Sequence, residues 1–69
     1  MLNELVLITR NTQARLNRDG SVDVYDFPHR VWLGKANTKG EVVATSHLNV
    51  LTHATRIRTA WHILTRKTP

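Results

Sequence analysis

The chain has 69 residues, a formal net charge of +5 and a hydrophobic fraction of 41%. A chain this short builds one core, so we expect a single domain over residues 1–69, and its hydrophobic content argues against disorder throughout. Cysteine is absent, which excludes disulfides and thiolate-bound zinc as sources of stability. A core of this size supplies only about 3–5 kcal/mol, so a homodimer is one way for the chain to gain stability.

The first part of the sequence predicts strands joined by turns. Residues 2–9 end in a run of branched apolar residues, which favours a short buried strand. Apolar residues then alternate on both sides of an Asp-Gly pair within residues 13–27. An Asp-Gly pair between alternating runs is a hairpin signal, because glycine adopts positive φ without steric cost. We therefore expect a hairpin over residues 13–27.

A second hairpin is predicted after Pro28, which has no amide hydrogen and interrupts the preceding strand. Residues 29–35 resume the alternation, with Val31 and Leu33 on one face and Trp32 on the other. The Asn-Thr-Lys-Gly sequence at residues 37–40 is a turn signal. It leads into residues 41–44, which we expect to form the return strand.

The last part of the sequence favours an amphipathic helix. No glycine or proline occurs between residues 41 and 68. Apolar residues recur at helical spacings in the stripe formed by Val50, Ala54, Ile57, Trp61 and Leu64. Ser46 is placed to cap the first turn. Four threonines in this region are poor helix formers, so a long strand over residues 47–66 stays open as the alternative.

The predicted fold is therefore α+β: a small antiparallel β-sheet of three to four strands with two hairpins, and one C-terminal amphipathic α-helix packed on it. Trp32 and Trp61 are the largest apolar side chains available to fill the contact between the helix and the sheet. No stretch approaches the roughly 18 apolar residues that a membrane span needs, and no signal-peptide core is visible. We expect a soluble, cytoplasmic protein without a membrane partner.

No recognisable catalytic or metal-binding arrangement is present, so we expect no enzyme, no catalytic residue, no metal and no cofactor. His47 and His53 are six residues apart, and His53 and His62 are nine apart, whereas helical metal-binding pairs stand three or four apart. A ribonuclease needs a general base, a general acid and a cation for the phosphate. The residues His53, His62, Tyr25 and Arg58 have suitable chemistry, but no spacing connects them, so ribonuclease-like activity is only an alternative.

Positive charge is concentrated toward the C-terminal end. Residues 1–41 contain six basic and all five acidic residues, whereas residues 42–69 contain four basic residues and no acid. A helix under selection for stability alone normally interleaves the two signs at i,i+4. Clustered Lys and Arg attract phosphate polyanions, although net charge for solubility is the simpler explanation. The contacts predicted here are Arg56, Arg58, Arg66 and Lys67, which spread around the polar arc of a helical wheel.

The predicted architecture offers a second route to nucleic acid. An antiparallel sheet with one helix across it is similar in outline to the AP2-type and integrase arm-binding modules, which read the major groove of DNA with the sheet. This similarity concerns architecture alone. No motif of either family is present in this sequence, so no residue is assigned from the similarity. If the sheet is the contact surface, the basic residues expected at the interface are Arg15, Arg18, Arg30 and Lys35.

Charge and size together predict a small basic nucleic-acid-binding protein, with DNA favoured and RNA left open. Its length and lack of an enzymatic signature favour an accessory or regulatory role of the kind that phages and mobile elements use. The alternative is a protein-interaction module or inhibitor that docks on an acidic surface of a larger protein. Its anchors would be the aromatic residues near Pro28, namely Tyr25, Phe27 and Trp32, because aromatic residues often dominate interfaces.

Overall fold

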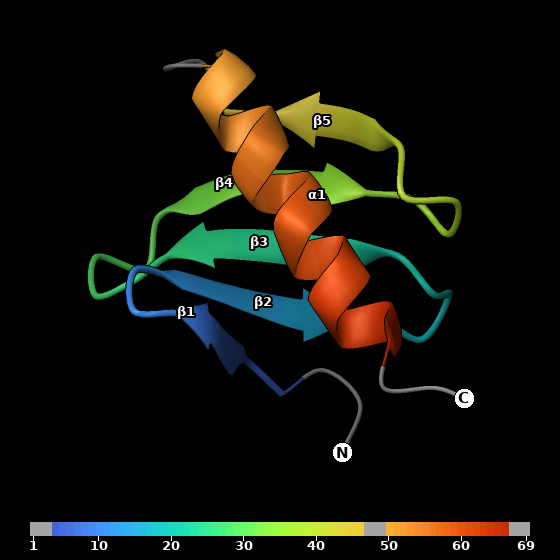
Figure 1. The fold of residues 1–69 in the computed structure, drawn as a ribbon, viewed down its shortest axis with the longest axis horizontal. Coiled ribbons are helices and arrows are strands. Elements are labelled where there is room, and N and C mark those ends of the chain that lie inside the picture. The colour runs from blue at the N-terminus through green and yellow to red at the C-terminus, as the bar shows by residue number, and fades with distance from the viewer. Residues whose placement is uncertain (1–3, 47–49, 67–69) are drawn as a thin grey trace.

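The described part of the chain, residues 4–46 and 50–66 of a computed structural model, forms five strands and one helix (Figure 1). These elements are β1 (Val6–Thr9), β2 (Thr12–Leu16), β3 (Val22–Asp26), β4 (Trp32–Ala36), β5 (Val42–Thr45) and α1 (Val50–Arg66). The strands make one antiparallel sheet in the order β1-β2-β3-β4-β5. α1 crosses one face of that sheet. The predicted α+β class is confirmed, but the sheet has five strands instead of three to four.

Both predicted hairpins are present, and a glycine closes each turn. Gly20 and Gly40 have φ values of +89° and +86°, a region that side chains with a Cβ enter only at a cost. Their amides donate to the carbonyls of Asn17 and Asn37, each at 3.0 Å. The Asn37 side chain also accepts hydrogen bonds from the amides of Lys39 and Glu41. The turns therefore fix the register of both hairpins.

β1 differs from the buried strand that the sequence predicts. It is an edge strand, paired with β2 alone, and Leu5 and Leu7 are 39% and 54% exposed. Val6 and Ile8 pack against the core. Alternate side chains of a strand point to opposite faces, and within residues 4–46 and 50–66 an element, α1, packs on one face of this sheet alone. The predicted first residues, 2 and 3, lie outside the described part of the chain.

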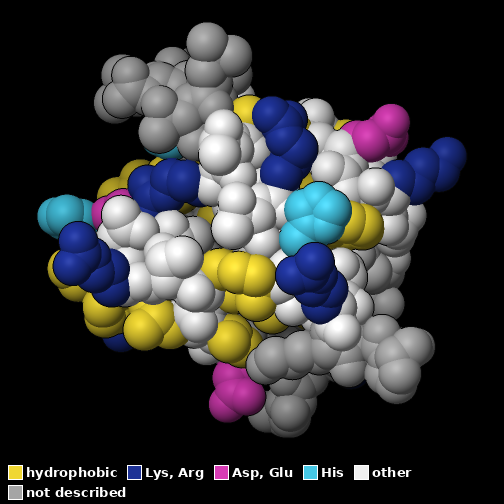
Figure 2. Space-filling view, viewed as in Figure 1, with side chains coloured by type: hydrophobic (Ala, Val, Ile, Leu, Met, Phe, Trp, Pro, Cys, Tyr) yellow, Lys and Arg dark blue, Asp and Glu magenta, His cyan; other side chains and the backbone are white. Residues whose placement is uncertain are grey.

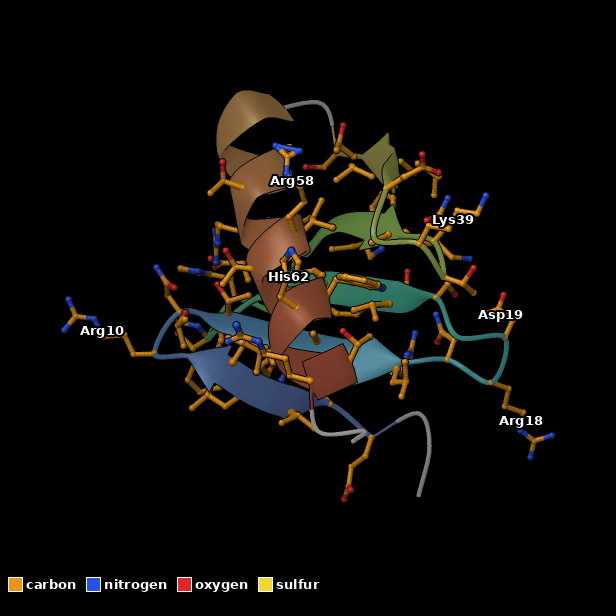
Figure 3. The ribbon with its side chains drawn as sticks, turned by 45° about the vertical axis from the view of Figure 1, so that its right-hand side comes forward. Arg10, Arg18, Asp19, Lys39, Arg58 and His62 are labelled. Carbon is orange, nitrogen blue, oxygen red and sulfur yellow. The ribbon has the colours of Figure 1, made fainter. Side chains whose placement is uncertain are left out.

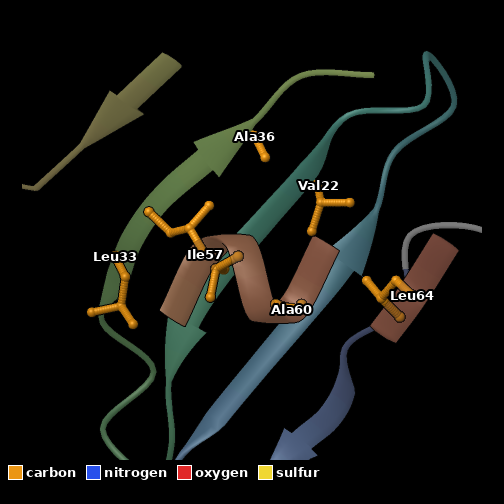
Figure 4. Packing of buried hydrophobic residues seen from close by; sticks show 8 residues of the cluster. Val22, Leu33, Ala36, Ile57, Ala60 and Leu64 are labelled. Atoms are coloured by element: carbon orange, nitrogen blue, oxygen red, sulfur yellow. The ribbon is translucent and has the colours of Figure 1, made fainter. Parts of the chain in front are cut away.

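The core lies between α1 and the sheet (Figure 4). From the helix, Ile57, Ala60 and Leu64 are buried, at the spacing of one helical face. The helix is thereby confirmed over the strand alternative. Ala54 and Trp61 from the predicted stripe are half-buried at its margin. The buried apolar residues of the sheet are Ala14, Val22, Val24, Leu33 and Ala36.

Close approach of α1 to the sheet depends on a glycine in β4. A Cβ added at Gly34 would collide with the Ile57 side chain and would lie 2.5 Å from the carbonyl oxygen of Ala44. Real Cβ atoms do not approach backbone oxygen so closely, so any larger residue forces a backbone shift. Gly34 therefore sets the distance between the helix and the central strands.

A bulge in β4 breaks the predicted alternation of residues 29–35. The register pairs Val24 with Gly34 but Tyr25 with Trp32, which leaves Leu33 as the extra residue. Leu33 is buried, whereas Val31 precedes the strand and is 55% exposed. The expectation that these two side chains share one face is therefore wrong.

The two tryptophans lie on different sides of the sheet, so the prediction that both fill the contact between helix and sheet is wrong for Trp32. Trp61 packs against the core from α1, and a Cβ on Gly40 would come within 2.8 Å of its ring. Trp32 pairs with Tyr25 across β3 and β4. That register position lies on the face away from the helix, because Val24 and Gly34 occupy the covered face.

Ser46 does not occupy the predicted cap position, because α1 begins at Val50. Its hydroxyl oxygen instead lies 2.9 Å from Nδ1 of the buried His53. The contact joins the end of β5 to the helix across the intervening segment.

Candidate functional site

One face of the sheet is left open. α1 packs on the other face, and no further element of the described chain covers this one (Figure 1). The strand register places its side chains in two rows that run across the strands. We call this surface the open face. One row is Leu7, Gln13, Tyr25 and Trp32, and the other is Arg15, Asp23, Lys35 and Ala44.

Hydrogen bonds fix the side chains at the centre of the open face. Asp23 accepts hydrogen bonds from Trp32 Nε1 at 3.1 Å and from Asn17 Nδ2 at 2.9 Å. Arg15 Nη2 donates to the Tyr25 hydroxyl at 3.0 Å and lies 3.8 Å from the Asp23 carboxylate. The Arg15 guanidinium also lies 5.7 Å from the centroid of the Tyr25 ring, within the range of a cation–π contact. The aromatic rings and the arginine are thus held in place before any ligand binds.

The open face still has bonding capacity. Lys35 stands opposite Asp23 in the register but forms no ion pair with a described residue. Gln13 Oε1 and Arg15 Nε are shielded from solvent and have no hydrogen-bond partner within the described chain. An unpaired shielded polar atom costs about 1–3 kcal/mol.

Arg18 and Arg30 lie at opposite ends of the sheet. Arg18 is exposed in the turn between β2 and β3 and extends away from the sheet (Figure 3). Arg30 is exposed in the loop between β3 and β4, with φ at +59°, and its amide donates to the Asp26 carbonyl at 2.7 Å. The four basic residues predicted for a sheet interface thus span the sheet, with Arg15 and Lys35 at its centre.

Arg56, predicted as a contact of the C-terminal segment, is engaged inside the molecule. Its Nη2 forms an ion pair with Asp26 Oδ1 at 3.0 Å and also reaches the Asn11 carbonyl. Its Nε donates to Thr12 Oγ1 at 3.0 Å. These bonds hold α1 to the β1–β2 loop and to the end of β3. We therefore assign Arg56 a structural role.

Two carboxylates titrate below their ordinary range because of their hydrogen bonds. His29 Nδ1 lies 2.6 Å from Asp26 Oδ2, and the bonds to His29 and then to Arg56 lower the pKa of Asp26 below 3.8. The hydroxyl and the amide of Ser21 donate to Asp19 and lower its pKa as well. Both groups stabilise the fold in their ionised form.

A line of exposed basic side chains runs along the outer side of α1. Arg58, His62 and Arg66 follow one another at i, i+4 and i+8, and all three are exposed. We call them the helix stripe. Figure 3 shows Arg58 and His62 on the same side of the helix, and the Trp61 ring supports His62 edge-on at 5.0 Å. Lys67, the remaining predicted contact, lies outside the described residues.

The charge that stays available is divided between separate parts of the surface. Among the Lys and Arg residues within 4–46 and 50–66, only Arg15 and Arg56 pair with a carboxylate. Figure 2 shows basic side chains standing apart on the helix-bearing side, with the acidic side chains toward its periphery. The basic residues that form no ion pair with any described residue are Arg10, Arg18, Arg30, Lys35, Lys39, Arg58 and Arg66.

The described residues assemble neither a cluster of metal ligands nor the suggested ribonuclease group. No three His, Asp or Glu side chains converge there to hold a metal ion. Tyr25 belongs to the open face, whereas Arg58 and His62 lie on the opposite side, so the suggested ribonuclease group is not brought together. His47 lies outside the described part of the chain. In that part, no helix has the length and apolar character needed to cross a bilayer.

No protein-family model matches this chain, and neither a curated protein nor a solved structure does. What the protein does therefore has to be inferred from its own surfaces.

Proposed function

We propose that the protein binds nucleic acid, with DNA as the favoured ligand, and that the open face is the contact surface. The observation that carries the proposal is an uncovered sheet face on which Arg15, Lys35 and Gln13 stand beside Tyr25 and Trp32. β-Ribbons and sheets are known to enter DNA grooves. Arg and Lys pair with guanine edges and Gln pairs with adenine, while aromatic rings stack on unpaired bases.

Phosphate contacts would come from the ends of the same sheet. Arg18 and Arg30 are exposed at opposite ends and have no ion pair with a described residue. Phosphate contacts set register and affinity, whereas base-edge contacts set specificity. The open face and the two loops at its ends together supply both kinds of group, which supports a sheet-mediated interface over one made by the helix alone.

Replacing Arg15 and Lys35 by glutamine tests the proposal. We expect R15Q/K35Q to weaken binding of a short duplex about tenfold or more, because it removes two base-edge contacts. R18Q/R30Q should instead make the slope of log K against log salt shallower by about 2, because it removes two phosphate contacts. A filter-binding titration over a salt series measures both quantities. The matched control is R10Q/K39Q, which removes the same charge from two exposed turn residues.

Two outcomes would contradict the proposal. Equal losses in R15Q/K35Q and R10Q/K39Q would mean that net charge acts without a defined surface. Wild-type affinity no better than millimolar at low salt would exclude nucleic acid as the ligand. A single-stranded oligonucleotide in the same titration distinguishes groove entry from base stacking.

A protein-docking module is the second candidate. It is favoured by the aromatic pair Tyr25 and Trp32 on the open face, because aromatic residues often anchor protein interfaces. A stoichiometric protein retained from nuclease-treated host lysate, and lost with Trp32→Ala, would support this function. Loss of every partner after nuclease treatment would support nucleic acid.

A further inference from the structure

We infer that the helix stripe is a second nucleic-acid contact surface, so that one molecule bridges two nucleic-acid segments. This inference rests on the proposed function for the first segment, which occupies the open face. The second segment is a phosphate backbone held by Arg58, His62 and Arg66.

Charge complementarity identifies the occupant of the helix stripe. α1 contains no acidic residue, and neither Arg58 nor Arg66 forms an ion pair with a described residue. Four residues of helix rise about 6 Å, so the stripe presents a line of donors about 12 Å long. Two arginines on a helix without carboxylates suit a regular polyanion, because each phosphate neutralised there releases counterions.

The stripe has its own structural support. The Trp61 ring stands at 76° to the His62 ring, which limits the orientations available to the imidazole. Arg56, by contrast, faces a different flank of α1 and is tied to Asp26. The helix thus carries one structural arginine, Arg56, and the separate, exposed helix stripe. The net charge of the sequence does not reveal this difference.

The two surfaces cannot serve one straight duplex. Figure 1 looks down the shortest axis of the molecule, along which α1 lies in front of the sheet. The backbone extends 16 Å along that axis. A duplex seated on the open face therefore has the sheet and the helix between it and the stripe. The stripe stays free in that complex and can hold a second segment.

Co-capture of two duplexes tests the bridge. One duplex is fixed to beads and a second, labelled duplex is free in solution, and the label retained by added protein is measured. We expect wild type to retain the second duplex. We expect R58Q/R66Q to retain about one tenth of that label or less. Its affinity for a single duplex should change by no more than about threefold, since the open face is intact.

The control variants separate bridging from net charge and from dimer formation. R10Q/K39Q should retain co-capture, and circular dichroism should show R58Q/R66Q folded, because both side chains are exposed. Retention of the label by R58Q/R66Q would overturn the inference, since bridging would then come from two copies using one face each. Single-duplex binding without co-capture by wild type would also overturn it, but would leave the proposed function standing. Absence of any duplex binding would remove both.

Discussion

At the scale of single residues, the fold depends on one arginine. Arg56 and Arg58 are two positions apart on α1, yet Arg56 bonds to Asp26, Thr12 and Asn11 while Arg58 is exposed. A hydrogen bond to a charged group contributes more than a neutral one. The two arginines therefore contribute differently to the stability of the fold.

Arg56→Ala should lower the free energy of unfolding by about 1–3 kcal/mol, because it removes an ion pair and leaves the Thr12 and Asn11 acceptors without their donor. Arg58→Ala is the matched control and should stay within about 0.5 kcal/mol of wild type. Urea denaturation measures both. Equal stabilities of the two variants would contradict the structural role of Arg56.

Asp26 should make stability sensitive to acid. Its pKa is lower in the folded state than its ordinary value of 3.8, so its contribution is complete above that value and is lost as pH falls through the folded-state pKa. Asp26→Asn should be less stable than wild type at neutral pH. Its stability should also decline less between about pH 5 and about pH 2. Thermal denaturation across that range checks the sign, and an unchanged acid slope would contradict it.

The sequence cannot show which arginine is structural. Arg56 and Arg58 are the same residue type in the same helix. Their roles differ because Asp26, thirty positions from Arg56, lies beside only one flank of the helix. Pairing over that separation depends on tertiary packing, which residue spacing does not encode. The sequence predicts a basic helix, but it does not distinguish the structural residue Arg56 from the exposed residues Arg58 and Arg66.

At the scale of elements, local sequence signals predict the hairpins and the helix. The bulge, the helix–sheet distance and the strand order depend on tertiary contacts. The Asp-Gly and Lys-Gly turns and the apolar residues at helical spacing are recognisable within short stretches of sequence. The bulge at Leu33 and the approach of Ile57 to Gly34 are not, because they depend on how strands and helix pack. The edge position of β1 was missed for the same reason.

Gly34→Ala should destabilise the protein by about 1–3 kcal/mol through overpacking. Ile57→Val removes the Cδ1 atom that an added Cβ would meet, so it should cost less in the G34A background than in wild type. A double-mutant cycle followed by thermal denaturation measures this coupling. Additive effects would show that the helix does not limit the residue at this position.

At the scale of the whole molecule, the charge asymmetry of the sequence becomes a division between two sides. Arg15 and Lys35 lie on the open face and Arg18 and Arg30 at its ends. In the helix, Arg56 contacts Asp26, whereas Arg58 and Arg66 are exposed in the helix stripe. The sequence predicts an excess of positive charge, but strand register and helix phase decide where it points. The proposed function and the bridging inference both depend on this division.

The separation of Trp32 and Trp61 has a practical consequence. With Trp61→Phe, all indole emission comes from Trp32 on the sheet, and with Trp32→Phe it comes from the residue beside His62. Added DNA should quench the emission of Trp61→Phe early in a titration. It should quench the emission of Trp32→Phe only when a second duplex binds. The order in which the two sides of the molecule fill would then be visible without any added dye.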